Sequence, residues 1–155
     1  MAVAVVDSER LAAGPPELRD LLRRILADEV NHARFGWKLV AEVAPSLDAA
    51  TRERLGRYLA VAFAHLEKHE LDHMPPAPAP SAEAEALGLC DTRRTRALFY
   101  ETAERVIVPG LERLGLPASQ AWSDRGARNS CRAAPTTGGE NRDRLCGMGA
   151  AGAPR

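Results

Sequence analysis

Between Pro16 and Pro45 the apolar side chains recur at alternating intervals of four and three residues. This spacing places them on one side of an α-helix, because an α-helix has 3.6 residues per turn. Proline is tolerated in the first helical turn and stops a helix further along the chain. We therefore expect a helix that starts at Pro15 or Pro16 and stops before Pro45, with one stripe facing other helices: Leu18, Leu22, Ile25, Glu29, His32, Gly36, Leu39 and Val43.

A second long helix is predicted after this stop. Ser46 or Asp48 can cap its first turn, because a short oxygen-bearing side chain accepts hydrogen bonds from free backbone N–H groups. The helix is expected to continue to about Met74, where two prolines follow. Its apolar stripe runs into three ionisable residues at its end and consists of Leu55, Leu59, Ala62 or Phe63, Leu66, His69, Glu70 and His73.

A third long helix is expected from Asp91 or Thr92 to Gly115, with a kink at Pro109. Residues 75–80 alternate proline and alanine and predict a stiff extended linker, and residues 81–87 predict one short helical turn. No alternation of apolar and polar residues typical of a strand competes with this interpretation. The predicted fold class is therefore all-α, an antiparallel helical bundle with three long helices.

The two ends of the chain are expected to differ from the middle. Residues 1–14 are predicted to be a flexible N-terminus, and residues 15–122 form the predicted bundle. Residues 123–155 hold six of the twelve glycines, and their only large apolar side chains are Leu145 and Met148. Such a segment buries too little apolar surface to offset the entropy lost on ordering. We therefore expect a disordered tail rich in glycine and arginine.

Composition narrows the function classes. The 21 basic and 21 acidic residues give a formal net charge of zero, which argues against a nucleic-acid-binding protein. No stretch approaches the roughly 18 consecutive apolar residues that a membrane span needs. Three widely spaced cysteines predict a reducing compartment and no disulfide framework. The sequence thus predicts a cytoplasmic protein without nucleic-acid or membrane partners.

The first stripe carries an ionisable pair, Glu29 and His32, in an E-x-x-H arrangement. Residues three apart lie one helical turn apart on the same face, and helical bundles use this spacing to bind a pair of iron or manganese ions. Glu70 and His73 repeat the pattern in the second helix. An alternative for this second pair is an exposed histidine that interacts favourably with the helix C-terminus.

The third helix offers Glu101 and Glu104, and either could supply a bridging carboxylate. The alternative is that these glutamates pair with Arg105 or Arg94 on a solvated face. Glu67 lies off the second stripe and is expected in solvent. Four aromatic residues are expected in the core: Phe35, Trp37, Phe63 and Phe99.

Residues 25–37, with the sequence ILADEVNHARFGW, resemble the D-E-x-x-H-A-R motif of ferritin-like domain proteins, relatives of rubrerythrin and other di-iron carboxylate proteins. Residues 106–118 are similar to C-terminal helices in uncharacterised bacterial members of that group, so the resemblance covers roughly residues 16–122. It implies a four-helix bundle around iron or manganese, with oxidase-type redox activity. It further implies a bridging role for Glu29, a terminal imidazole from His32, and Asp28 as a partner for the other ring nitrogen of His32.

The chain departs from that family in one respect. Three long helices are predicted where the family has four, and no upstream helix pair with its own Glu and E-x-x-H is present. Two hypotheses follow. Either a homodimer assembles the bundle from two half-bundles and binds the metal, or the chain is a metal-free structural or protein-interaction module. Whether the protein is an enzyme is left open by the sequence.

Overall fold

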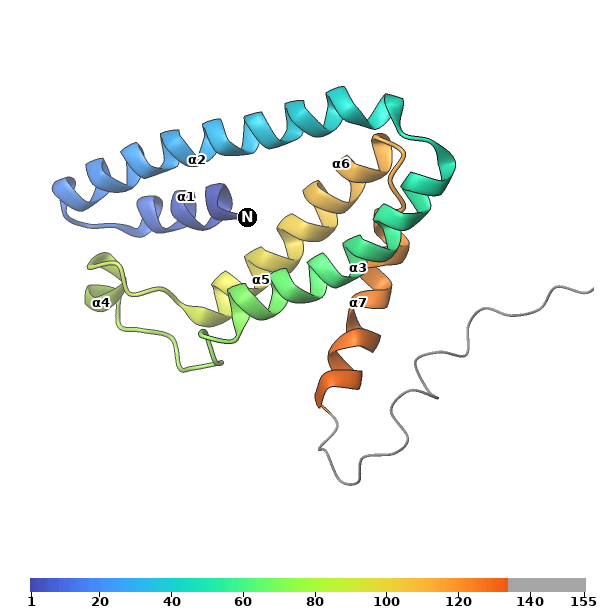
Figure 1. The fold of residues 1–155 in the computed structure, drawn as a ribbon. Helices are drawn as coiled ribbons and strands as arrows, with labels where there is room; N and C mark the ends of the chain where they lie inside the picture. Colours follow the sequence, from blue (N-terminus) through green and yellow to red (C-terminus); the bar gives the residue numbers. More distant parts are fainter. Residues whose placement is uncertain (134–155) are drawn as a thin grey trace, which may run out of the picture.

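The computed structural model describes residues 1–133, and within that range it is helical, with no strand. The predicted all-α class is therefore confirmed. The elements follow one another along the chain as shown in Figure 1: α1 (Ala2–Ala12), α2 (Pro16–Val43), the 3-10 turn η1 (Ala44–Ser46), α3 (Ala49–Leu71), α4 (Ala82–Ala86), α5 (Thr92–Thr102), the π-helical turn η2 (Ala103–Ile107), α6 (Val108–Arg113) and α7 (Ala118–Ala133).

Local capping explains most of these boundaries. Asp48 Oδ1 accepts the Thr51 N–H at 2.7 Å at the start of α3, and Asp91 Oδ1 accepts the Arg93 N–H at 2.9 Å before α5. These bonds satisfy backbone donors that have no partner inside the helix. Gly115 ends α6 with a φ of 75°, a left-handed conformation that glycine adopts without steric cost. The predicted caps of both helices and the predicted stop at Gly115 are confirmed.

Helices α5 and α6 form one rod that is interrupted by the π turn η2. Pro109 lies directly after this turn and has no N–H to donate to the carbonyl four residues earlier. The irregularity expected at Pro109 therefore appears just upstream of it. In a π turn the hydrogen bonds join residues i and i+5, and Ala103 and Val108, which are five residues apart, are both buried.

The hydrophobic core is formed by α3, the α5–α6 rod and α7. Trp122 of α7 lies edge-on to Phe63 of α3, with ring centroids 5.3 Å apart, and Phe99 of α5 is almost completely buried beside them. Within residues 1–133 this core contains no side chain from α2. Its buried members are Ala60, Phe63, Leu71, Phe99, Ala103, Val108, Ala118, Ala121 and Trp122.

Helix α2 lies along one edge of the molecule, and α1 packs alongside it (Figure 1). Its C-terminal half is held by Trp37, whose half-buried ring packs on Gly110 of α6 but is not part of the core in which it was expected. The α2 stripe was expected to face other helices, and this expectation is wrong for Ile25, Leu39 and Val43, which are exposed. A bundle core shared by three long helices is therefore not what this chain forms, and a ferritin-like arrangement is not confirmed.

A helix lies at each end of the described part of the chain. Helix α1 occupies most of residues 1–14, the predicted flexible N-terminus, and is anchored by Met1, which packs against the core, and by the buried Ala13. Helix α7 crosses the boundary predicted at residue 122 and continues to Ala133. Alanine and one tryptophan suffice to dock it, so few large apolar residues were needed. Residues 134–155 of the predicted tail lie outside the described part.

Arg52 connects three elements at the turn after α2. Its guanidinium donates to the carbonyl oxygens of Leu47 at 3.1 Å, Leu114 at 3.1 Å and Gly115 at 3.0 Å, and also to that of Ala44. The planar fork of an arginine suits several carbonyl acceptors at once. This side chain therefore joins the end of α2, the start of α3 and the end of α6.

None of the helices in residues 1–133 combines the length and the hydropathy needed to cross a bilayer.

Candidate functional site

The predicted metal-ligand pair of α2 lies on an accessible part of the helix. The Nδ1 atom of His32 is 3.9 Å from the Oε2 atom of Glu29, so the two side chains do share a face. The imidazole of His32 is 77 % exposed, whereas the carboxylate of Glu29 is half-buried. The expectation that His32 points toward other helices of the same chain is therefore wrong. The pair could supply two ligands to one cation, with the other positions left to water or to another chain.

The second pair, Glu70 and His73, lies at the C-terminal end of α3. Glu70 Oε1 is 3.5 Å from Nδ1 of the neighbouring His69, and His73 Nδ1 is 3.1 Å from the His69 carbonyl oxygen. His73 is exposed just beyond the last residue of the helix. This geometry matches the alternative interpretation, in which a histidine satisfies a free carbonyl at a helix C-terminus.

The two glutamates of the α5–α6 rod have separate protein partners. Glu101 Oε1 lies 2.9 Å from Arg105 NH1, which is the surface pairing considered as the alternative to metal binding. Glu104 Oε1 accepts a hydrogen bond from the indole N–H of Trp122 at 3.4 Å. The structure thus gives each of these carboxylates a role within the fold.

The predicted ligands are not brought together within one chain. Among the residues that the structure describes, no group of three or more His, Cys, Asp or Glu side chains could hold a metal ion. A di-iron carboxylate centre takes its ligands from several helices at once. The described residues of a single copy therefore do not fit such a centre.

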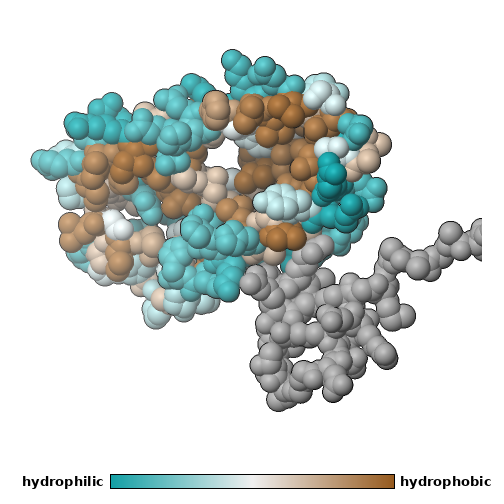
Figure 2. Space-filling model, in the orientation of Figure 1, coloured by the Kyte–Doolittle hydropathy of each residue, from teal (hydrophilic) through white to brown (hydrophobic). Residues whose placement is uncertain are grey.

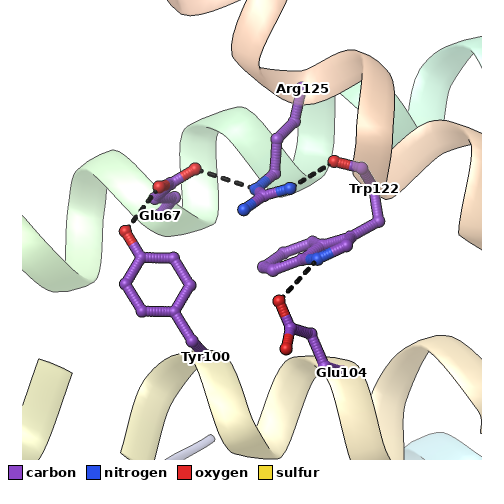
Figure 3. A network of polar contacts seen from close by, with 5 residues as sticks. All are labelled: Glu67, Tyr100, Glu104, Trp122 and Arg125. Carbon is purple, nitrogen blue, oxygen red and sulfur yellow. Dashed lines mark hydrogen bonds and ion pairs between the residues drawn. The ribbon is translucent and has the colours of Figure 1, made fainter. Parts of the chain in front are cut away.

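The most enclosed polar cluster joins α3, α5 and α7 (Figure 3). Glu67 accepts the hydroxyl of Tyr100 at 2.7 Å with one oxygen and the Arg125 Nε–H at 3.0 Å with the other. The side chains of Glu67 and Arg125 are only 21 % and 17 % exposed. The expectation that Glu67 lies in solvent is therefore wrong, because its hydrogen-bond partners come from elements 33 and 58 residues away.

Aromatic contacts complete this cluster. The guanidinium carbon of Arg125 lies 3.4 Å from the centroid of the Trp122 ring, and its NH1 group donates to the Trp122 carbonyl oxygen. Burial and the hydrogen bond to Glu67 raise the pKa of the Tyr100 hydroxyl above its ordinary value. Each of the five residues in Figure 3 has a hydrogen bond to another member of the cluster, which is the arrangement of a structural clamp.

Helix α2 carries a row of exposed apolar side chains, which we call the outer face of α2. All 28 residues of α2 are described, and none is buried. The outer face consists of five residues that are 39 to 70 % exposed: Leu21, Ile25, Phe35, Leu39 and Val43. Figure 2 shows apolar surface over the C-terminal half of the helix.

Phe35 is the most exposed member at 70 %, so its expected place in the core is wrong. The reason is the width of the apolar arc on α2. The helix buries part of that arc against α1 and α6 through residues such as Trp37, and the remainder faces outward. Sequence periodicity identified an apolar helix face but not which part of it the chain itself covers.

No protein-family model, curated protein sequence or solved structure matches this chain.

Proposed function

We propose that this protein is a helical protein-interaction module and that the outer face of α2 is its docking surface. The observation that carries the proposal is the exposure of five large apolar residues in one row on a helix of 28 residues. Monomeric soluble proteins rarely leave a contiguous apolar patch of more than a few hundred Å² in water, and larger patches mark interaction sites.

The spacing of the row indicates what kind of partner fits. The row repeats at alternating intervals of four and three residues: Leu21, Ile25, Asp28, His32, Phe35 and Leu39. Its two middle positions, Asp28 and His32, are polar. Such a row accepts another amphipathic helix, whose side chains insert between its own. Helix α2 is held by its packing against α1 and by the contact of Trp37 with Gly110 of α6, and both contacts lie on a different side of the helix from the row.

The test is a photo-crosslinking amino acid at position 35 of the full chain, produced in the organism that carries the gene. The matched control carries it at position 58, because Tyr58 is similarly exposed at 65 % but lies on α3. We expect a defined protein adduct from position 35 and none from position 58, identified by mass spectrometry. Equal or absent adducts at the two positions would contradict the proposal.

A second candidate function is metal binding by Glu29 and His32, which the adjacency of these two accessible side chains favours. Iron or manganese are the ions expected from the ferritin-like resemblance, and oxidase-type redox activity would accompany them. The carboxylate and imidazole supply oxygen and nitrogen ligands of the kinds that suit these metals.

Metal content per chain tests this second candidate. The full chain is purified after expression with added iron or manganese, and is compared with Glu29→Ala/His32→Ala and with the matched control Glu70→Ala/His73→Ala. Near-stoichiometric metal in the parent and the control, but not in the first variant, would support a site at Glu29 and His32. Equal metal in all three samples would exclude it.

A further inference from the structure

We propose that the partner of the outer face of α2 is a second copy of this chain, docked antiparallel across a twofold axis near His32. This inference rests on the proposed function of α2 as a docking helix and names its occupant. Three features of α2 support it: the symmetry of the apolar row, the charges beside it and its length.

Four of the five residues of the outer face lie symmetrically about His32, and the fifth, Phe35, lies three residues from it on the C-terminal side. Ile25 and Leu39 lie seven residues to either side of His32, and Leu21 and Val43 lie eleven residues to either side. In a twofold interface every contact occurs twice. If one residue of the first copy contacts a different residue of the second copy, the same two residues also meet with the copies exchanged. An antiparallel pair of α2 helices therefore brings Leu21 near Val43 of the second copy, and Ile25 near its Leu39.

The charges beside the row are complementary in the same arrangement. Arg24, Lys38 and Glu42 are exposed on one flank of the row at 3.6 residues per turn, and the exposed Asp28 lies at the edge of the row on the same side. Antiparallel pairing places Arg24 opposite Glu42 of the second copy and Asp28 opposite its Lys38. A parallel, in-register pair would instead bring opposite flanks of the two helices together, so these four charged groups would not face one another across the interface.

These four charged groups are available for such pairs. Within the part of the chain that the structure describes, none of them takes part in an ion pair, although neighbours such as Arg23 and Asp20 do, at 3.4 Å. The flanking charges of a helix pair set the orientation of the partner more than its affinity. Unpaired charges of alternating sign beside an apolar row therefore favour an antiparallel second copy over an unrelated apolar helix.

The row is long enough for a stable helix pair. Leu21 and Val43 are 22 residues apart, which corresponds to about 33 Å along the helix and to about three heptads. Helix pairs sustained over this length are typical of coiled-coil association. Figure 1 shows α2 along one edge of the molecule, and the five residues of the outer face are exposed, so none of the described elements covers that face.

The first experiment is the molecular mass of the full chain by sedimentation equilibrium. We expect twice the chain mass of 16.7 kDa for the parent and the single-chain mass for Phe35→Glu. Tyr58→Glu is the matched control, because it places the same charge at a similarly exposed aromatic position outside the row. Circular dichroism checks that each variant is helical. A monomeric parent, or a dimeric Phe35→Glu variant, would overturn the proposal.

The second experiment tests the antiparallel orientation. In the full chain with its three native cysteines changed to serine, His32→Cys and Leu21→Cys are oxidised separately. We expect a disulfide-linked dimer for His32→Cys, because the two copies of position 32 meet at the axis. Leu21→Cys should stay unlinked, since its two copies lie at opposite ends of the row, about 33 Å apart. Efficient linkage of Leu21→Cys would show a parallel pair and overturn the proposal.

The two proposals fail in different ways. A monomeric parent whose position 35 crosslinks to a different protein would overturn the second copy as partner and leave α2 as a docking helix. A monomeric parent with no specific adduct at position 35 would overturn both. A dimeric parent whose position 35 crosslinks to its own chain would support both.

Discussion

At the scale of single residues, two helical glycines have opposite surroundings. A Cβ atom built on Gly110 would lie 2.9 Å from Cζ3 of Trp37 and even closer to the edge of the ring, whereas one built on Gly36 meets nothing within 4 Å. The Trp37 ring therefore depends on the missing side chain at position 110. This close approach is the contact that joins the C-terminal half of α2 to α6.

We expect Gly110→Ala to lower the free energy of unfolding by about 1–3 kcal/mol, because the added methyl group overpacks a rigid aromatic ring. Gly36→Ala should raise it by up to about 1 kcal/mol, since alanine is the better helix former. Urea unfolding of both variants in the Phe35→Glu background, where the proposed dimer does not form, gives the comparison. Equal effects would show that Trp37 does not pack closely on α6.

Tyr100 should make stability depend on alkaline pH. Its raised pKa means that the folded state holds the phenolic proton more tightly than the unfolded state, whose tyrosine pKa is about 10. The stabilisation is thus fully present below pH 10 and is lost as the pH rises through the folded-state pKa. In Tyr100→Phe this part of the dependence should vanish, with a loss of about 1 kcal/mol at neutral pH for the missing hydrogen bond.

Unfolding curves between pH 8 and 12 measure this difference between the parent and Tyr100→Phe. Parallel loss of stability in both proteins above pH 10 would contradict the assignment. Tyr100 is a suitable reporter because its hydroxyl bonds directly to Glu67, at 2.7 Å, inside the clamp.

The role of a residue could be predicted from the sequence where its partners lie only a few residues away along the chain. Asp48, Asp91 and Gly115 act within four residues of their own positions, so their roles as caps and stop followed from the sequence. Glu67 and Arg125 are 58 residues apart and meet only because α3 and α7 pack together. No pattern within one helix distinguishes such a glutamate from a solvated one.

At the scale of elements, the ion pair of Glu67 and Arg125 fastens α7 to α3. Removing Arg125 leaves a largely buried carboxylate that keeps only the Tyr100 hydroxyl as partner. We expect Arg125→Met to cost about 2 kcal/mol of the free energy of unfolding, and Glu67→Gln to cost a similar amount. In the double variant the loss should be clearly smaller than the two single losses added together, because the variants remove one shared interaction.

A double-mutant cycle by urea unfolding measures this coupling. The exposed pair Glu53 and Arg57, 2.6 Å apart on α3, is the matched control and should show a coupling of only about 0.5 kcal/mol. Additive losses at Glu67 and Arg125 would mean that the pair does not fasten α7.

Three elements show why the arrangement was harder to predict than the helices themselves. The bounds of α2 followed from its prolines, but its apolar arc is wide enough to have two faces, and periodicity does not say which one is covered. Helix α1 lies in a short apolar run that gains stability only from tertiary packing, mainly against α2 and also against α5. Helix α7 docks through Ala118, Ala121 and Trp122, a face too small to stand out in composition.

At the scale of the whole molecule, self-association links stability to concentration. A dimer that forms through α2 stabilises the folded chain by mass action. We therefore expect the thermal midpoint of the parent to rise with protein concentration and that of Phe35→Glu to stay constant. Calorimetry or circular dichroism over a hundredfold range of concentration tests this. A constant midpoint for the parent would contradict association in that range.

The two proposed properties of α2 also make a joint prediction. An antiparallel pair brings one Glu29–His32 pair from each copy to the same axis, so that four ligands come from two chains. We expect any metal held there to be lost in Phe35→Glu, although both ligand residues remain. Metal analysis of this variant beside Tyr58→Glu tests the link. Full metal content in monomeric Phe35→Glu would show that a single copy is sufficient.

The π turn before Pro109 has a consequence for how the gene tolerates changes in length. Buried positions along the rod fall at Thr95, Phe99 and Ala103, four residues apart, and then at Val108, five residues further. The π turn therefore holds one residue more than a regular α-helical turn. Val106, within this turn, points outward and is 51 % exposed. A deletion of one codon in this turn would restore the four-residue spacing of the core positions, with Pro109 still lacking its backbone hydrogen bond, whereas a deletion one turn earlier or later would rotate half of the rod out of register.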